Sequence, residues 1–331
     1  MLSALTSLLL PLVLGVAGGR GGWLTARRDL TNESAIAVLN RFALLLAFPA
    51  LVVASFLDPA RGAAAIGWPL LVLASAPLLT GALAGAALGG RRIGRALLPS
   101  RGELTLVALF GNSAYLGLPL VAALVGPAAV PLGSVVVSMQ VALTVTLGTA
   151  MLRADARTTP AGPRVCEVAR TLLASPLAMS PLVGLALGAG LRALGLAAHP
   201  GTLALFHALD TLGKTASPLG LFVLGLFLGR RPPTLSGLAG QLTFALLRLV
   251  VVPGATLLLA LVLSVAVRIP HDTLRTLVLL AAVPAAISTF AMAEDAGADR
   301  EAVARAIVTT SVLSLGTLPA WLAIVERLGP R

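Results

Sequence analysis

Small polar residues gather beside a proline in one long apolar stretch of this sequence, FGNSAYLGLPLVAALVG (110–126). Asn112 and Ser113 can donate and accept hydrogen bonds, whereas Pro119 lacks a backbone N–H and crowds the preceding turn of a helix. We therefore predict a helix that is broken at Pro119. Such a break frees backbone N–H and C=O groups, which are tolerated at membrane depth only inside protein or beside a water-filled cavity.

A second stretch, LLAAVPAAISTFAMAEDAG (279–297), repeats this pattern with a proline, Pro284, followed by two hydroxyl residues. Two interrupted helices in corresponding halves of a chain are typical of a binding site near the middle of a membrane, and half-helix N-termini favour a carboxylate there. The alternative is that both prolines only kink their helices. Because the interruptions coincide with small polar residues, we favour a substrate site. The predicted substrate-binding residues of these two stretches are Asn112, Ser113, Pro119, Ser288 and Thr289.

The only lysine of the sequence, Lys214, lies in another apolar stretch, one helical turn after Asp210. Charges inside a membrane are costly and usually have a function. In that reading Lys214 attracts an anionic substrate and is a sixth binding residue, while Asp210 tunes its charge or relays a coupling proton. The alternative, given equal weight, is an i,i+4 ion pair that neutralises itself, or a lysine that reaches the membrane interface.

The remaining polar residues in apolar stretches are interpreted as structural. We expect Arg41 and Arg248 to be structural partners or to lie near an interface, and Asn40 and Gln140 to line a cavity or to join helices. The three histidines lack the spacing of metal ligands, and no nucleotide-binding loop, zinc-protease motif or nucleophile elbow occurs. The sequence thus predicts no enzyme, with no catalytic residue, metal or cofactor. Without a nucleotide-binding loop, any transport of a substrate across the membrane would be secondary or facilitated and not driven by ATP.

The composition indicates which elements must position these residues. Hydrophobic residues make up 57% of the chain and charged residues 11%, against roughly 25% charged in soluble proteins. The mean hydropathy is +0.97. Several runs without charge are long enough for a hydrocarbon core, which takes about 20 apolar residues. These runs are 62–90, 104–152, 171–191, 276–293 and 306–325. We predict an all-α membrane protein in a lipid bilayer.

Apolar runs between charged loops and Gly/Pro pairs predict about ten transmembrane helices. Residues 104–152 would form a helix of roughly 74 Å, against a core of about 30 Å, so they must make two spans, separated at Gly126-Pro127. The predicted spans lie near 3–19, 34–57, 64–90, 104–126, 128–152, 171–191, 203–229, 237–267, 276–294 and 302–325.

The arginines between these spans orient the chain. Fifteen lie in loops on one side and six on the other, and the richer side should be cytoplasmic. Both termini then lie outside the cytoplasm and the loop 153–170 lies inside, in a multi-pass protein of the cell (inner) membrane. Arginines placed between apolar runs are not the basic stripe of a nucleic-acid-binding domain, so we expect no nucleic acid as partner.

The two halves of the sequence can be aligned as an internal repeat, with an offset near 170 residues. Pro11-Leu12-Val13 recurs as Pro181-Leu182-Val183, and Pro49 corresponds to Pro218. The chain then consists of a five-helix repeat (1–152), a cytoplasmic loop (153–170) and a second five-helix repeat (171–331). Because five is odd, the second repeat enters the membrane inverted, as in many secondary transporters.

Three segments carry a resemblance to a known family: GNSAYLGLPLVAALVG in the fourth span, DTLGKTASPLGLFVLGLFLG in the seventh, and VPAAISTFAMAEDAGADREAV leading into TLPAWLAI at the end. They resemble the auxin efflux carrier family, which includes the plant PIN proteins and bacterial malonate transporter homologues. The resemblance implies a fold similar to bile acid/sodium symporters. That fold has ten helices in two inverted repeats, with a scaffold domain, a transport domain, and fourth and ninth helices that cross at their broken centres.

The resemblance also implies export or exchange of small organic anions by an elevator-like movement. The family's crossover asparagine and proline fall on Asn112 and Pro119, whereas the second crossover proline of plant members falls on Thr289. The chain lacks the long cytoplasmic loop of long plant members, so auxin specificity does not follow. Alternatives of the same fold are a sodium- or proton-coupled symporter and a sensor that binds without transport. A homodimer is one assembly left open.

Overall fold

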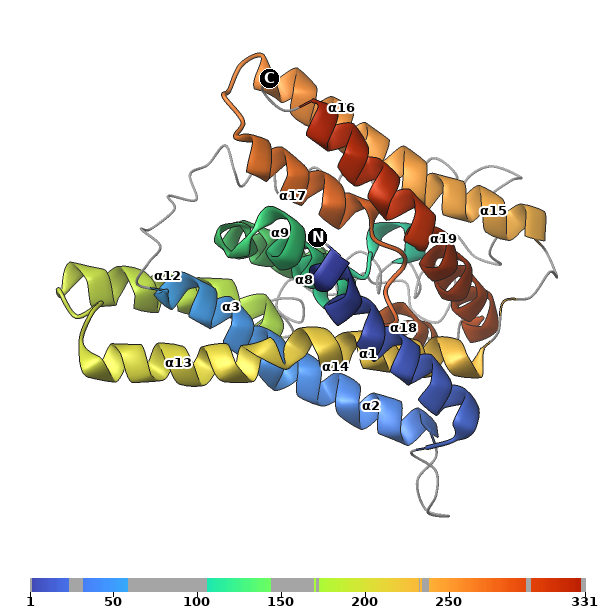
Figure 1. Ribbon diagram of the computed structural model, residues 1–331, viewed down its shortest axis with the longest axis horizontal. Coiled ribbons are helices and arrows are strands. Elements are labelled where there is room, and N and C mark those ends of the chain that lie inside the picture. Colours follow the sequence, from blue (N-terminus) through green and yellow to red (C-terminus); the bar gives the residue numbers. More distant parts are fainter. Residues whose placement is uncertain are drawn as a thin grey trace. The chain divides into compact units, whose positions relative to one another are not determined.

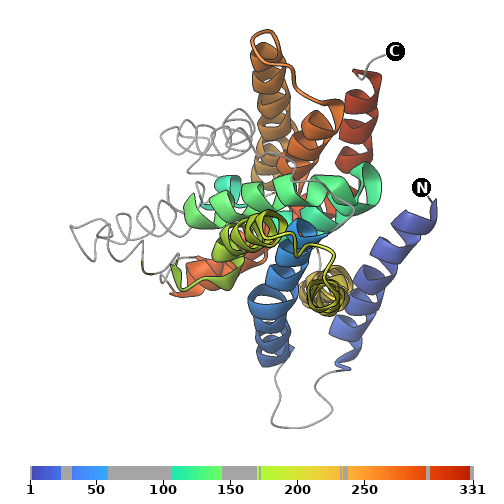
Figure 2. The ribbon, with the colours of Figure 1, turned by 90° about the vertical axis from the view of Figure 1, so that its left-hand side faces the viewer.

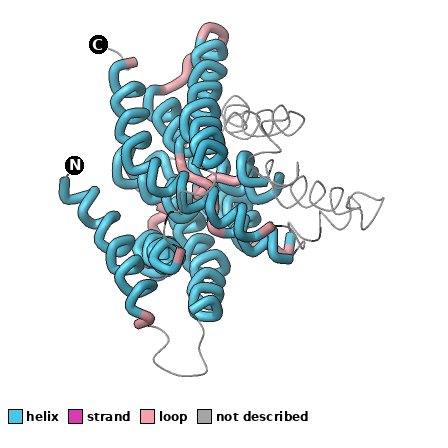
Figure 3. The backbone as a smooth tube through the Cα atoms, turned by 90° about the vertical axis from the view of Figure 1, so that its right-hand side faces the viewer, coloured by secondary structure: helices cyan, strands magenta, loops and turns pink. Residues whose placement is uncertain are grey.

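The computed structural model describes residues 2–23, 32–58, 106–143, 170, 173–231, 233, 238–295 and 299–328. In these residues the backbone is almost entirely helical (Figure 3), and the β-type pairing is an isolated antiparallel bridge between Gly111 and Ala285. The described part of the chain therefore agrees with the predicted all-α class. The predicted span 64–90 and the loop 153–170, apart from Arg170, lie outside the described residues.

Five helices in the described residues are long and apolar enough to cross a membrane. They are Ile36–Leu57, Pro176–Ala193, Pro200–Arg230, Gly240–Ser264 and Arg300–Arg327. Each overlaps one of the spans predicted from the sequence. The hydrophobic side chains on their surfaces are consistent with a lipid surrounding.

The backbone contacts divide the chain into two units, and the first comprises residues 1–67, 114–138 and 172–230. Its longer helices (Figure 1) are α1 (Leu2–Gly21), α2 (Asn32–Phe42), α3 (Phe48–Leu57), most of α9 (Val130–Leu143), α12 (Pro176–Ala193), α13 (Pro200–Lys214) and α14 (Ala216–Arg230). Its short elements are η1 (Ala43–Ala47), most of η2 (Ser113–Gly117), α8 (Leu118–Leu120), η3 (Val121–Val125) and η4 (Pro127–Ala129).

Glycines bring α1 and α14 into backbone contact. Gly15 and Gly19 lie one turn apart on α1, as do Gly225 and Gly229 on α14. A Cβ atom on Gly225 would overlap the backbone of Leu12, and each of the other three would overlap the backbone of the facing helix. This is the small-xxx-small pattern that lets membrane helices approach closely, and here it occurs on both partners.

The helix α3 packs against both α12 and α13 (Figure 2). Gly184 and Gly188 of α12 leave room for Phe56, whose backbone carbonyl also accepts two hydrogen bonds from Arg192, each 3.3 Å. On the α13 side, Gly213 lies against the backbone of Leu51. Small residues thus set the close packing of both helices against α3.

The second unit comprises residues 68–113, 139–171 and 231–331. Its described helical elements include residues 106–109 and the end of α9. The others are α15 (Leu238–Leu246), η6 (Leu247–Val251), α16 (Val252–Ser264), α17 (His271–Ala282), α18 (Ser288–Asp295) and α19 (Arg300–Arg327). The C-terminal helix α19 packs against α15, α17 and α18, and α16 packs against α17. The predicted ninth span is thus two helices, α17 and α18, separated by the non-helical residues 283–287.

Three prolines are each preceded by a widened, π-helical turn. The turns η1, η2 and η6 end two residues before Pro49, Pro119 and Pro253. A proline cannot bond the carbonyl four residues earlier and clashes with it, and a π turn removes the clash without ending the helix. Where the freed carbonyl belongs to Leu249, it accepts a 2.7 Å hydrogen bond from Trp321 Nε1.

The predicted break at Pro119 is therefore wrong. Pro119 is buried in a helical run, Ser113–Val125, that continues through it because η2 absorbs the steric clash. The break lies earlier, at residues 110–112. The break predicted at Gly126-Pro127 is confirmed, since the helix ends at Gly126, whose φ of 125° ordinary residues rarely adopt.

Candidate functional site

Two interrupted segments of the second unit meet at their breaks. Residues 110–112 follow the helical residues 106–109, and residues 283–287 follow α17. Asn112 N donates to Pro284 O at 2.7 Å, and Ala286 N donates to Phe110 O at 2.9 Å. These bonds flank the Gly111–Ala285 bridge. We call residues 110–112 and 283–287 together the crossing. In the crossing, backbone N–H and C=O groups that lack helical partners in one break form hydrogen bonds with those of the other break.

Gly111 allows this close approach. A Cβ atom at residue 111 would overlap Arg248 Nη2 and would lie 2.9 Å from Val283 Cγ2. Every other residue type carries a Cβ, so a side chain at this position would force the two backbones or the guanidinium apart. The glycine of the GNSAY motif thus has a packing role at the crossing.

Side chains from flanking helices donate hydrogen bonds to backbone carbonyls near the crossing that have no backbone partner among the described residues. Arg248 donates from Nε to Val283 O at 3.1 Å and from Nη1 to Ala108 O at 3.0 Å. Gln140 Nε2 donates to Leu109 O at 2.9 Å. These three carbonyls lie at the C-terminal ends of the helical residues 106–109 and of α17. No N–H group of the same helix follows there to bond them.

On the α18 side, Ala285 N donates to Thr310 Oγ1 at 3.2 Å. Thr289 is fully buried, and its Oγ1 donates to Ala286 O at 2.6 Å. Ser288, half buried, is the first residue of α18. Thr289, proposed from the sequence as a substrate residue, thus ties α18 to the end of the crossing.

Asn112 is the predicted site residue with an unused donor. Its side chain is 2% exposed, and its Nδ2 has no hydrogen-bond partner among the described residues. A buried amide without a partner is unfavourable by about 1–3 kcal/mol. Ser113, the first residue of η2, is also buried, and its Oγ lies 3.5 Å from Leu280 O, the carbonyl that Pro284 cannot bond. Helices begin at Ser113 and Ser288, directly after the crossing, and the positive end of a helix dipole favours an anion. At the start of α18 the N–H groups of Thr289 and Phe290 donate to Ala286 O and Ile287 O.

Asp210, Lys214 and Pro119 belong to the first unit. Lys214 Nζ lies 2.6 Å from Asp210 Oδ2, with the lysine side chain 73% and the aspartate 27% exposed. The i,i+4 ion pair that the sequence offers as one alternative is therefore formed. Lys214 ends α13, where its positive charge also favours the helix C-terminus.

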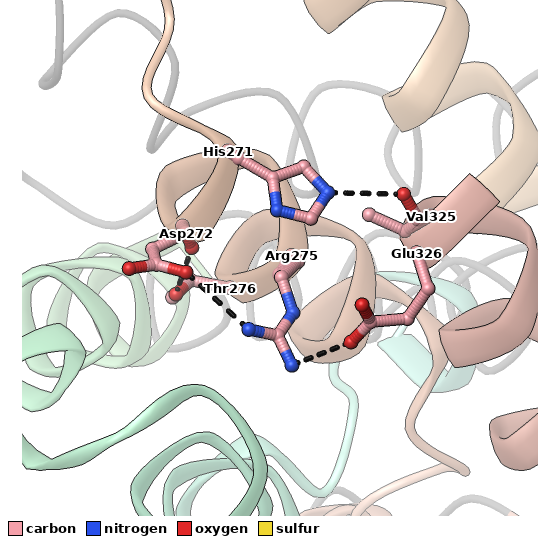
Figure 4. Close-up of polar contacts among 6 residues, drawn as sticks. All are labelled: His271, Asp272, Arg275, Thr276, Val325 and Glu326. Atoms are coloured by element: carbon pink, nitrogen blue, oxygen red, sulfur yellow. Dashed lines mark hydrogen bonds and ion pairs between the residues drawn. The ribbon is translucent and has the colours of Figure 1, made fainter. Parts of the chain in front are cut away.

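A polar cluster fixes the start of α17 relative to the end of α19 (Figure 4). Arg275 forms ion pairs with Asp272 at 3.3 Å and with Glu326 at 2.6 Å. The ring Nε2 of His271 is 3.1 Å from Val325 O. These contacts position the helix whose other end enters the crossing.

Sequence reasoning assigned structural roles to two of the residues that support the crossing, but it did not place them there. Arg248 was expected to be a structural partner or near an interface, and Gln140 to line a cavity or join helices; both make structural hydrogen bonds between segments. Thr310 was not singled out. Arg248 is 1% exposed, and it is the one charged residue between Arg231 and Arg268. That isolation was the available signal, because a charge in the middle of an apolar span usually has a partner or a function.

The geometry is that of a membrane protein with interrupted helices and buried polar groups at their breaks. In the described residues, no three His, Cys, Asp or Glu side chains gather as metal ligands. No curated protein matches the chain. A family model described as "Membrane transport protein" matches residues 8–322, nearly the whole sequence. The chain therefore belongs to this membrane transport family, that of the auxin efflux carriers and PIN-like proteins.

Proposed function

We propose that the protein is a secondary or facilitated efflux carrier of small organic anions such as carboxylates, working by elevator-type alternating access. The observation that carries the proposal is the buried, unpartnered Nδ2 of Asn112 beside two helix starts, at Ser113 and Ser288. A carboxylate accepts a hydrogen bond from an amide donor, and the positive end of a helix dipole favours its charge. Ser113, Pro119, Ser288 and Thr289 complete the proposed binding region, and Lys214 is a candidate countercharge tuned by Asp210.

The proposed architecture has ten helices in two inverted five-helix repeats, residues 1–152 and 171–331, joined by a cytoplasmic loop at 153–170. It would divide into a scaffold and a transport domain in the cell membrane, with both termini outside the cytoplasm. The occurrence of one interrupted segment in each half, at 110–112 and 283–287, supports this arrangement. Small organic anions and the bilayer are the expected partners, and a homodimer is compatible with this proposal.

The test is solid-supported membrane electrophysiology on reconstituted protein, with malonate, other dicarboxylates and indole-3-acetate as candidate substrates. Asn112→Ala removes the amide donor, and we expect the saturable current to fall by roughly 10- to 100-fold, because a hydrogen bond to a charged group contributes about 1.5–3 kcal/mol. Ser134→Ala is the matched control. Ser134 is equally buried, but its hydroxyl donates within its own helix to Pro131 O at 2.7 Å.

The outcome separates this proposal from its alternatives. Equal currents from Asn112→Ala and Ser134→Ala, in protein that remains folded, would reject the site. Currents that require sodium rather than choline, or a pH gradient, would identify a coupled symporter. Saturable binding without current or tracer exchange would identify a sensor.

A further inference from the structure

The side chain of Arg248 lies in an apolar environment that offers it carbonyl oxygens. It projects from the π turn η6, between Leu247 and Leu249, which are also buried. In residues 240–264 no other charged residue occurs. Within the described residues, no carboxylate forms an ion pair with Arg248. Its Nε and Nη1 donate to backbone carbonyls, whereas its buried Nη2 has no hydrogen-bond partner among the described residues. The groups that offset its charge are therefore backbone dipoles.

Both acceptors of Arg248 terminate interrupted helices. Val283 follows the last residue of α17, and Ala108 lies in the final turn of the helical residues 106–109. A helix C-terminus carries roughly half a negative charge, so two such ends together match about one positive charge. One guanidinium supplies that charge, and its planar fork reaches both ends at once.

The same chemistry attracts metal ions in other carriers, since unwound carbonyls and half-helix C-termini coordinate Na⁺ in transporters with broken helices. We propose that Arg248 is a positioning residue that acts as a tethered cation: its guanidinium occupies the place between the two interrupted helices where a bound ion would otherwise hold them together. The crossing is then assembled without an exchangeable ion. This inference is independent of the substrate.

Chemical rescue tests the proposal on purified full-length protein. Arg248→Ala removes the charge and both donors, and we expect the melting temperature to fall by roughly 5–10 °C. The deleted atoms correspond to ethylguanidinium. Millimolar ethylguanidinium should restore more than half of the loss, whereas ethylurea, its neutral isostere, should not. The transport current of the variant should recover with the same selectivity.

Arg192→Ala is the matched control. Arg192 also donates twice to a backbone carbonyl at a helix end, that of Phe56 in the last turn of α3, but it contacts this one helix end instead of joining two, and it is only partly buried. The proposal predicts no ethylguanidinium rescue for this variant. Equal rescue of both variants would mean that the ion acts generally on the protein, and it would overturn the proposal.

A second pair of variants tests the charge when Arg248→Ala fails to fold. Arg248→Lys keeps the positive charge, and Arg248→Met keeps most of the volume without it. The lysine variant should have the higher melting temperature and the larger current. Two results would overturn the proposal: a methionine variant as stable as the lysine variant, or an alanine variant as stable as the original protein. Either would show that the positive charge of Arg248 does not hold the two helices together. Because melting requires no substrate, this result does not depend on the proposed transport activity.

Discussion

Lys214 offers the sharpest test of an individual charge. Its ammonium is exposed and paired with Asp210, and an exposed ion pair contributes about 1 kcal/mol or less to stability. Lys214→Ala should therefore leave the melting temperature nearly unchanged. If Lys214 attracts the anionic substrate, the same change should raise the half-saturating substrate concentration by roughly 3- to 10-fold.

Asp210→Asn is the companion to Lys214→Ala. It removes the neutralising carboxylate and leaves the lysine, so a substrate role for Lys214 predicts equal or tighter anion binding in this variant. Similar half-saturating concentrations in the original protein and both variants would assign the pair to structure alone. Measuring the transport current as a function of substrate concentration in each variant distinguishes a substrate role for Lys214 from a purely structural role of the ion pair.

At the scale of elements, the α1–α14 contact depends on glycine. Gly225→Ala places a Cβ against the backbone of Leu12, and overpacking of this kind is unfavourable by about 1–3 kcal/mol. We expect a lower melting temperature in detergent. Gly190→Ala in α12 is the control, because a Cβ there meets nothing within 4 Å, and Gly→Ala at a compatible helical site is neutral or stabilising. Equal melting temperatures for the two variants would contradict close backbone packing.

The breaks in the helices could be predicted only in part. Pro284 and Gly126 mark real interruptions, because each stands where the chain leaves the helical conformation. Pro119 does not, since a π turn accommodates it. Nothing local in the sequence distinguishes Pro284, which marks a break, from Pro119, which does not. The decisive difference is whether neighbouring groups accept and donate the displaced hydrogen bonds, and that depends on packing between segments distant in sequence.

For the whole molecule, the arginine distribution predicts that the loop 153–170 is cytoplasmic. The single cysteine, Cys166, lies in this loop and provides a native probe. A membrane-impermeant maleimide should label it in inside-out vesicles and not in right-side-out vesicles. A Cys166→Ser, Leu328→Cys double variant should show the reverse pattern, since the C-terminus is predicted to lie outside. Labelling of Cys166 from the outer side would invert the proposed topology.

The composition was sufficient to predict a helical membrane protein, and the GNSAY and VPAAIST segments were sufficient to locate the residues near the crossing. The pairing of Gly111 with Ala285 could not be predicted, because register between two breaks is set by three-dimensional contact. The supporting role of Thr310 was hidden for the same reason. A threonine in an apolar helix usually bonds its own backbone, as Thr310 also does with Ala306 O at 2.8 Å.

The crossing also constrains the order of events while the chain is being made. The partner of Asn112 N is Pro284 O, so the break at 110–112 enters the membrane long before its partner exists. At about 5–20 residues per second, synthesis of the intervening chain takes roughly 10–30 s. During that interval the first break needs temporary hydrogen-bond partners, such as water, lipid headgroups or the insertion machinery. Biogenesis, rather than the finished fold, is therefore the stage at which this feature is most vulnerable.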